Sequence, residues 1–174
     1  MIDQRLYQAL TKRLFTEPGQ ATYAVLDGCM VDQLPQRLEA ARLDHACLFS
    51  GQLDPMLEAA APWVVQLKPG TAFTESVLRE GWNAHWGIVL QTAAATDLAA
   101  LRQHLRRQLR VSAPGGQSLF FRFYDPRAFR AVVPHLDDAQ RREFLGPIRK
   151  AWVEGADPTC ALLFQPGQAA TGEP

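Results

Sequence analysis

The sequence predicts a single α/β domain in which helices flank a mixed, mainly parallel sheet, with an antiparallel hairpin in the second half. Short apolar runs with β-branched or aromatic residues alternate with helical patterns along the first half. A glycine-rich turn then separates two further apolar runs, and no repeat, charge block or linker divides the chain. We expect the domain to span residues 1–165. Residues 166–174, rich in Gly, Pro and Ala, are expected to form a flexible C-terminal tail.

Four runs in the first half have the length and composition of buried strands. Asp32 and Asp54 are predicted to cap the helices between them, the second with Pro55 in the first turn. Thr96 followed by Asp97 gives the same start signal. Because strands alternate with helices, we expect parallel neighbours covered on both faces of the sheet. The expected strands are residues 23–27, 46–49, 63–67 and 86–91.

The second half changes character. Residues 111–124 are predicted to form two strands joined by a Pro-Gly-Gly turn, an antiparallel hairpin that joins the sheet. Asp125 before Pro126 is a helix start signal, and Asp137 is a second one. Residues 160–164 are the expected last strand.

Composition excludes several classes of protein. Eighteen basic residues balance eighteen acidic ones, so no overall field draws the chain to nucleic acid or an anionic membrane. No apolar run approaches the length of a membrane span, and the start of the chain lacks the apolar core of a signal peptide. We expect a cytoplasmic protein that binds neither membrane nor nucleic acid.

The residues that usually carry chemistry are scattered. Cys29, Cys47 and Cys160 fit neither a disulfide framework nor the paired spacing of a zinc site, and buried reduced thiols are expected. The four histidines stand apart, so we expect no metal. No nucleotide-binding or hydrolase motif is present, and no cofactor is expected.

One cysteine suggests an alternative function. Cys29 follows the predicted strand that ends at Asp27, a position where α/β enzymes place nucleophiles, and His45 or His85 could act as its base. A Cys-dependent hydrolase is therefore an alternative. The competing interpretation treats Asp27 and Gly28 as a turn, in which the carboxylate accepts backbone N–H bonds and the glycine supplies a positive φ.

The segment 98–110 predicts a strongly basic amphipathic helix. Leucines recur at helical spacing on one face, and Arg102, Arg106 and Arg110 repeat every four residues on another. No acidic residue lies between Asp97 and Asp125, so these arginines lack carboxylates nearby in sequence. They are expected to meet water, a distant acid or a ligand, and a nucleic-acid-binding accessory domain is a second alternative.

A series of motifs carries a family resemblance. Residues 119–129 read LFFRFYDPRAF, and YAVLDG, LFSG, APWVVQL and WGIVLQ precede them in that order. A Leu/Arg helix ending in LRV follows WGIVLQ, and HLDDAQRREFLGPI comes last. Together these motifs, over about residues 22–150, resemble the DUF4123 family.

The resemblance implies a non-enzymatic function. Members of the family are similar to adaptors, also described as chaperones, which bind a cognate type VI secretion effector and help load it onto the VgrG spike. No catalytic residue follows from it. Arg122 and Tyr124 are expected to alternate with phenylalanines along a strand, so that one pair faces the core and the other a second surface. The residues expected to bind the partner are Arg102, Arg106, Arg110, Trp82, Arg122, Tyr124 and Arg127, and those expected to be structural are Asp27, Gly28, Trp86, Gly87, Asp125 and Pro126.

Overall fold

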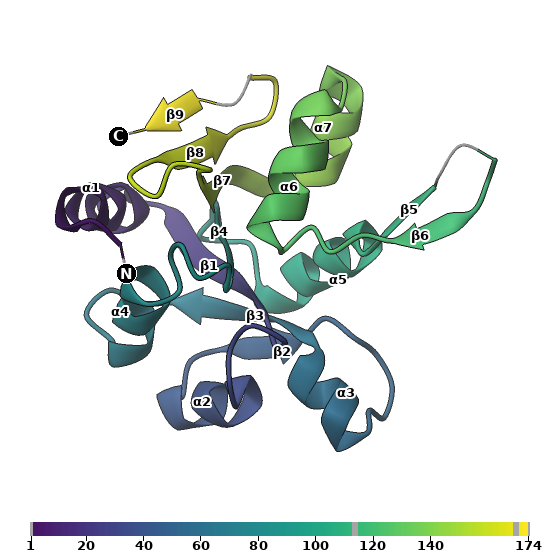
Figure 1. Cartoon of the computed structure of the whole chain (residues 1–174), viewed down its shortest axis with the longest axis horizontal. Helices are drawn as coiled ribbons and strands as arrows, with labels where there is room; N and C mark the ends of the chain where they lie inside the picture. The colour runs from purple at the N-terminus through teal and green to yellow at the C-terminus, as the bar shows by residue number, and fades with distance from the viewer. Residues whose placement is uncertain (1, 113–114, 169–170, 174) are drawn as a thin grey trace.

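A seven-stranded sheet forms the centre of the protein. The computed structural model describes residues 2–112, 115–168 and 171–173. The strand order is β2-β3-β1-β4-β7-β8-β9, and every pairing among the described strands is antiparallel (Figure 1). The strands are β1 (Gln20–Asp27), β2 (His45–Cys47), β3 (Pro62–Leu67), β4 (Gly87–Ala93), β7 (Ile148–Glu154), β8 (Ala161–Phe164) and β9 (Thr171–Glu173).

The prediction of a mainly parallel sheet is wrong, and the strand order shows why. The connection from β1 through a helix to β2 does join parallel strands, but β3 lies between them. In the same way β3 and β4 run parallel with β1 between them. A strand-helix-strand pattern in the sequence therefore predicts correctly that the two strands run parallel. It cannot show that a third, antiparallel strand lies between them in the sheet.

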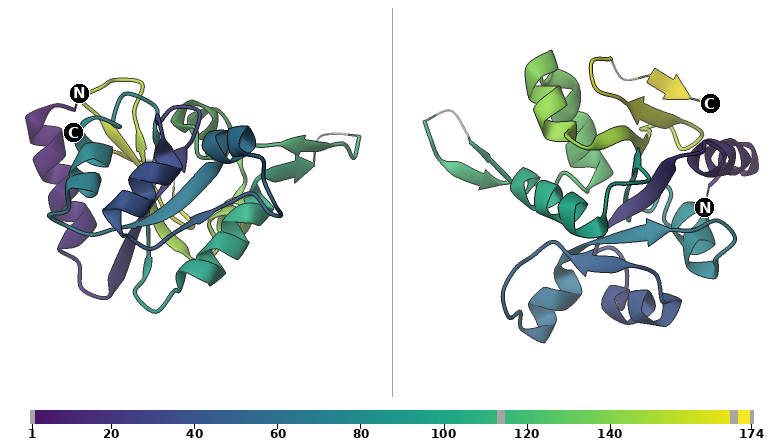
Figure 2. Two further views of the ribbon diagram at one scale, coloured as in Figure 1. Left: turned by 90° about the horizontal axis from the view of Figure 1, so that it is seen from below. Right: turned by 180° about the vertical axis from the view of Figure 1, so that it is seen from behind.

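Helices cover both faces of the sheet, as the sequence predicts. α1, α2 and α4 pack on one face, while α5, α6 and α7 pack on the other (Figures 1 and 2). β1 supplies both cores by alternation, because Ala24 and Leu26 face the first set of helices and Tyr23 and Val25 face the second. The helices are α1 (Gln4–Phe15), α2 (Leu34–Ala41), α3 (Pro55–Ala60), α4 (Ala72–Arg79), α5 (Leu98–Gln108), α6 (Pro126–Val132), the 3-10 helix η1 (Val133–His135) and α7 (Asp138–Leu145).

Most predicted helix starts are confirmed. The Asp54 carboxylate accepts the N–H bonds of Met56 and Leu57 (2.9 and 3.0 Å) at the start of α3. Asp125 caps α6, and Asp137 caps α7 with a reciprocal bond to Gln140. These caps are local devices, which is why the sequence alone locates them.

Other local predictions are wrong or incomplete. α2 is preceded by Gln33 in a left-handed conformation without a side-chain cap, so Asp32 does not start it. α5 is capped by Asp97, one residue after the predicted Thr96. α1, which is capped by Asp3, and the buried strand β7 were not predicted. Within the segment expected to be a tail, β9 pairs with β8.

The predicted hairpin exists, but it does not join the main sheet. β5 (Arg110–Ser112) and β6 (Ser118–Phe120) pair with each other alone and project from the body of the protein (Figure 2). The second strand ends at Phe120 and not at the predicted residue 124. The chain then turns back over the sheet, and the Phe121 N–H donates to the Leu109 carbonyl (2.8 Å).

A buried histidine joins α5 to α7. His104 lies on the leucine face of α5, and its Nε2 donates to the Phe144 carbonyl (2.8 Å). Because a carbonyl can only accept, Nε2 carries the proton. Burial lowers the pKa of His104 below its ordinary value of 6.5, since a charged imidazolium would be poorly solvated there.

Acid should therefore weaken the fold through His104. Its folded pKa lies below its unfolded value, so the unfolded chain takes up the proton first. The stabilising contribution is present above about pH 6.5 and lost as pH falls through the folded pKa. Urea unfolding between pH 7.5 and 5.0 should show a smaller loss of stability for His104→Gln, which keeps an amide donor for Phe144. Identical pH profiles for variant and wild type would contradict this assignment.

Candidate functional site

The family-like motifs converge where the central strand β1 ends and its neighbour β4 begins. β1 ends there with Asp27, whose N–H donates to the Trp86 carbonyl (2.8 Å) just before β4 begins. The Asp27 carboxylate is 1% exposed; it accepts the N–H of Cys29 (3.0 Å) and forms an ion pair with Arg122. Arg122 comes from the segment after the hairpin. Thus one residue, Asp27, joins YAVLDG, WGIVLQ and FRFYDPR, which are far apart in sequence: its N–H bonds to the Trp86 carbonyl and its carboxylate pairs with Arg122.

Two glycines permit this close approach. A Cβ on Gly28 would lie 2.2 Å from the Ala59 carbonyl oxygen, and a Cβ on Gly87 would lie 2.0 Å from the Val25 carbonyl oxygen. The positive φ predicted for Gly28 is not observed. Both glycines are needed because neighbouring backbone leaves no room for a side chain.

Residues 121–124 form no strand, and Arg122 and Tyr124 are not both exposed. Tyr124 is buried beside Phe123, which packs against Phe144 of α7, while Arg122 stays half-exposed with its guanidinium 5.9 Å from the centre of the Tyr124 ring. Burial, reinforced by the Asp27 charge, raises the pKa of Tyr124 and keeps its hydroxyl protonated. Tyr124 is therefore not available as a partner-binding residue, whereas Arg122 presents part of its guanidinium to solvent.

Two other residues predicted to bind the partner make contacts within the protein instead. Trp82 is 4% exposed and belongs to the first core, so it offers no surface for docking. Arg127 is exposed and forms a two-bond ion pair with Asp125, Nε to Oδ1 at 3.0 Å and Nη2 to Oδ2 at 2.8 Å. Burial favours the neutral form of Asp125, but hydrogen bonds and the charge of Arg127 outweigh it and lower the pKa of this carboxyl.

Trp86, which the sequence predicts to be structural, packs against a cation. The guanidinium carbon of Arg37 lies 4.9 Å from the centre of the Trp86 ring.

Cys29 is exposed, contrary to the expectation that it is buried. Partial burial of the thiol and the neighbouring Asp27 carboxylate raise its pKa, which keeps the sulfur neutral at pH 7. The two histidines that could serve as bases bond elsewhere. His85 Nδ1 bonds to Glu154, and His45 Nδ1 bonds to the Leu43 carbonyl (2.8 Å). This environment is the reverse of the one that activates a nucleophilic cysteine.

The three arginines predicted on one helix have different positions and roles. Arg102 and Arg106 lie in α5, whereas Arg110, expected in the same helix, is the first residue of β5. Arg102 reaches across to the end of β2, where Nε donates to the Cys47 carbonyl (2.6 Å) and Nη2 to the Phe49 carbonyl (3.0 Å). Arg102 therefore ties α5 to the sheet, and its side chain is not free to dock a partner. The side chains of Arg106 and Arg110 form no hydrogen bond or ion pair with other residues that the structure describes, and both border a hollow in the surface.

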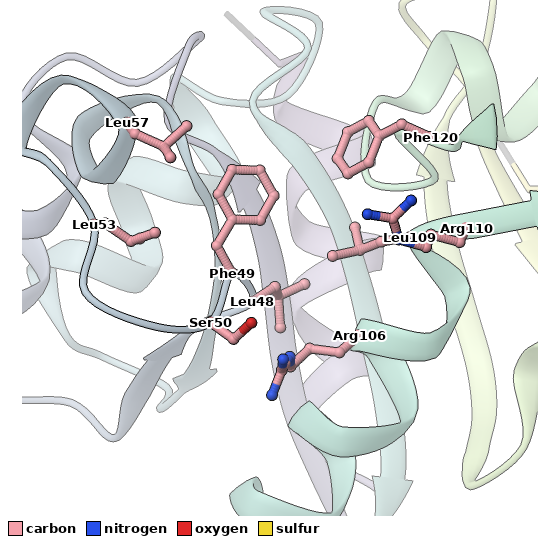
Figure 3. Close-up of a pocket in the computed structure, with 9 residues that line it drawn as sticks. All are labelled: Leu48, Phe49, Ser50, Leu53, Leu57, Arg106, Leu109, Arg110 and Phe120. Atoms are coloured by element: carbon pink, nitrogen blue, oxygen red, sulfur yellow. The ribbon is translucent and has the colours of Figure 1, made fainter. Parts of the chain in front are cut away.

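Sequence reasoning missed this hollow, which we call the apolar groove. It has a volume of about 370 Å³ and lies between the segment around α3 and the end of α5 with the hairpin (Figure 3). Phe49 and Phe120 meet edge to face across it, with ring centroids 5.9 Å apart. Its lining residues are Leu48, Phe49, Ser50, Leu53, Leu57, Arg106, Leu109, Arg110 and Phe120.

Exposed apolar side chains continue from the apolar groove onto the hairpin. Phe120 and Leu119 are each 50% exposed, and Val111 is 38% exposed. On the opposite wall Leu57 is 43% exposed. Met56, which is 82% exposed, lines a separate hollow beside Gly28. A signal for this surface existed in the sequence: Leu119 and Phe120 are consecutive apolar residues, and because side chains alternate along a strand, the two point to opposite faces and cannot both enter one core.

Other kinds of site are not apparent in the described ranges. Among these residues no group of three or more His, Cys, Asp and Glu is arranged to hold a metal ion. Within the same ranges, no helix has the length and apolar character needed to cross a membrane.

Replacing Gly87 tests the close approach of β4 to β1. Gly87→Ala should destabilise the protein by about 3 kcal/mol, the upper part of the range for overpacking, because the obstacle is backbone that cannot rotate away. Gly172→Ala is the control, since nothing lies within 4 Å of its Cβ position, and it should change stability by no more than about 0.5 kcal/mol. Chemical denaturation of both variants measures the difference, and comparable stabilities would refute the steric account.

Removing Arg122 tests the ion pair. Breaking a buried pair costs about 3–5 kcal/mol, and because Arg122 is partly hydrated we expect Arg122→Ala to cost about 2–3 kcal/mol. Arg127→Ala removes an ion pair from a more exposed site and should cost at most about 1 kcal/mol. Thermal and urea unfolding of the two variants give the comparison. A larger loss for Arg127→Ala would show that Asp27 does not depend on Arg122.

Comparison with known proteins identifies a family. A sequence model described as "Domain of unknown function (DUF4123)" matches residues 22–143, which run from β1 to α7 and include Asp27, Arg122 and the apolar groove. No curated protein and no solved structure shows significant similarity to the chain. The match covers more than two thirds of the sequence and confirms the resemblance of its motifs; this chain belongs to the DUF4123 family.

Proposed function

We propose that this protein is an adaptor that binds a cognate type VI secretion effector and assists its loading onto the VgrG spike. The observation that carries the proposal is the apolar groove with its continuation onto the hairpin. Contiguous apolar surface that is left exposed in a folded protein is typical of a site that another protein covers. The family resemblance supplies the identity of the partner.

The arrangement of the hairpin supports a docking function. A two-stranded hairpin gains little stability alone, and this one exposes Val111, Leu119 and Phe120 away from both cores. Covering these side chains with a partner would remove apolar area from water at roughly 25 cal/mol per Å². The hairpin and the apolar groove adjoin through Phe120, so one partner could contact both.

The adaptor is favoured over the alternatives from sequence. The neutral thiol of Cys29, with His45 and His85 bonded elsewhere, gives no support to a Cys-dependent hydrolase. Nucleic-acid binding relies on basic grooves with aromatic faces on which bases stack. Here Arg102 is occupied by backbone carbonyls, and the aromatic rings at the groove contact each other edge to face.

Loss of effector binding on polar substitution of the groove tests the proposal. The full chain should co-purify with an effector encoded by a neighbouring gene, and Leu57→Ser with Phe120→Ser should weaken that complex at least tenfold, or about 1.4 kcal/mol. Val132→Ser is the control, because Val132 is 37% exposed and lies outside the groove lining. Calorimetry with the purified effector gives the affinities. No complex between the wild-type pair would overturn the adaptor function.

A further inference from the structure

The chemistry of the apolar groove identifies the kind of segment that fits it. Its floor is apolar, because Leu48 and Leu109 are 1% and 6% exposed, and its walls carry the half-exposed side chains of Leu57 and Phe120. Two arginines and one serine complete the lining, and no acidic residue belongs to it. An occupant must therefore bring apolar side chains for the floor and negative charge for the border.

The positive charge extends beyond the groove. A second hollow of about 300 Å³ is lined by Gln103, Arg106 and Arg107, so Arg106 borders both. In the part of the chain that the structure describes, the side chains of Arg106, Arg107 and Arg110 form no hydrogen bond or ion pair. Arg102, one turn earlier, is held by two carbonyls. Cations without partners at the border of an apolar hollow favour an anionic ligand.

We infer that the segment of the effector bound in the apolar groove is a short acidic amphipathic stretch, whose apolar side chains fill the groove while its Asp or Glu side chains pair with Arg106, Arg107 and Arg110. The inference rests on the proposed adaptor function. The planar guanidinium bonds a carboxylate through two parallel N–H groups and is weakly hydrated, so it pairs well next to apolar surface. Carboxylates suit the site better than phosphates because most of the lining has to be covered by apolar atoms.

Charge reversal tests the inference with a matched control. Arg106→Glu with Arg110→Glu should weaken the affinity for the purified effector at least tenfold. Arg5→Glu with Arg42→Glu makes the same change in net charge at two exposed arginines outside the groove, and its affinity should stay within twofold of wild type. Raising salt from 50 to 500 mM should weaken wild-type binding more than binding by the groove variant. All affinities are measured by calorimetry on variants with unchanged circular dichroism.

Cross-linking then identifies the bound segment. Arg106→Lys with Arg110→Lys keeps the charge and supplies amines that a carbodiimide couples directly to carboxylates in contact. Mass spectrometry should place the cross-links on Asp or Glu residues of the effector that have Leu, Ile, Val or Phe within a few positions. Cross-links found only on effector Asp or Glu residues that have no Leu, Ile, Val or Phe within a few positions would overturn the inference.

The outcomes separate this inference from the proposed function. If the effector does not bind the wild-type chain, the adaptor function fails. If the effector binds and charge reversal changes its affinity by less than twofold, the adaptor function stands and the acidic segment is refuted. A 20-nucleotide single-stranded DNA serves as the competing anion. Its tight binding to the wild type, lost on Arg106→Glu with Arg110→Glu, would show that the arginines recognise phosphate and would also overturn the inference.

Discussion

The buried carboxylate of Asp27 is the constraint on which the rest of this structure depends. A charge withdrawn from water must be paired and hydrogen-bonded, and Asp27 meets this requirement with the N–H of Cys29 and the guanidinium of Arg122. The pairing fixes the segment after the hairpin over the end of the central strand. Phe123 and Tyr124 are thereby placed in the second core, and α6 begins two residues beyond Tyr124. The position of the hairpin follows from this anchor.

A second contact, made by Arg102, fixes the distance between the two walls of the apolar groove. Arg102 bonds the carbonyls of Cys47 and Phe49, so α5 and the end of β2 hold a constant separation. α5 thus uses Arg102 to shape the groove, while Arg106, one turn later, and Arg110, at the start of β5, border it. The arginines repeat regularly in the sequence, but one of them holds the fold together and the others lie at the surface. These two roles can be distinguished only when the carbonyls that accept the Arg102 hydrogen bonds are known, and they lie more than fifty residues earlier in the chain.

Sequence reasoning succeeds here where the cause is local. Asp54, Asp125 and Asp137 cap helices through bonds to residues two or three positions away, and the apolar runs that form β1, β3 and β4 carry their own signal. It fails where the cause is distant. Strand direction depends on the insertion of β3 between β1 and β2, and the burial of Trp82 and Tyr124 depends on packing against segments far along the chain. The family was recognisable because its motifs follow one another in a fixed order. The contacts of Asp27 that join these motifs could not be predicted from the sequence.

The strand order has a consequence for biosynthesis. β1 pairs with β3 and β4, and β4 completes its second side with β7, where Val89 lies opposite Trp152. Such non-local pairing makes folding slow compared with a helical bundle of the same size. Because β7 contributes Ala151 and Val153 to the core beneath α5, that core stays incomplete until residues 148–154 have been synthesised. The segments that border the apolar groove emerge earlier, so the nascent protein displays their apolar residues before the sheet that supports them is closed.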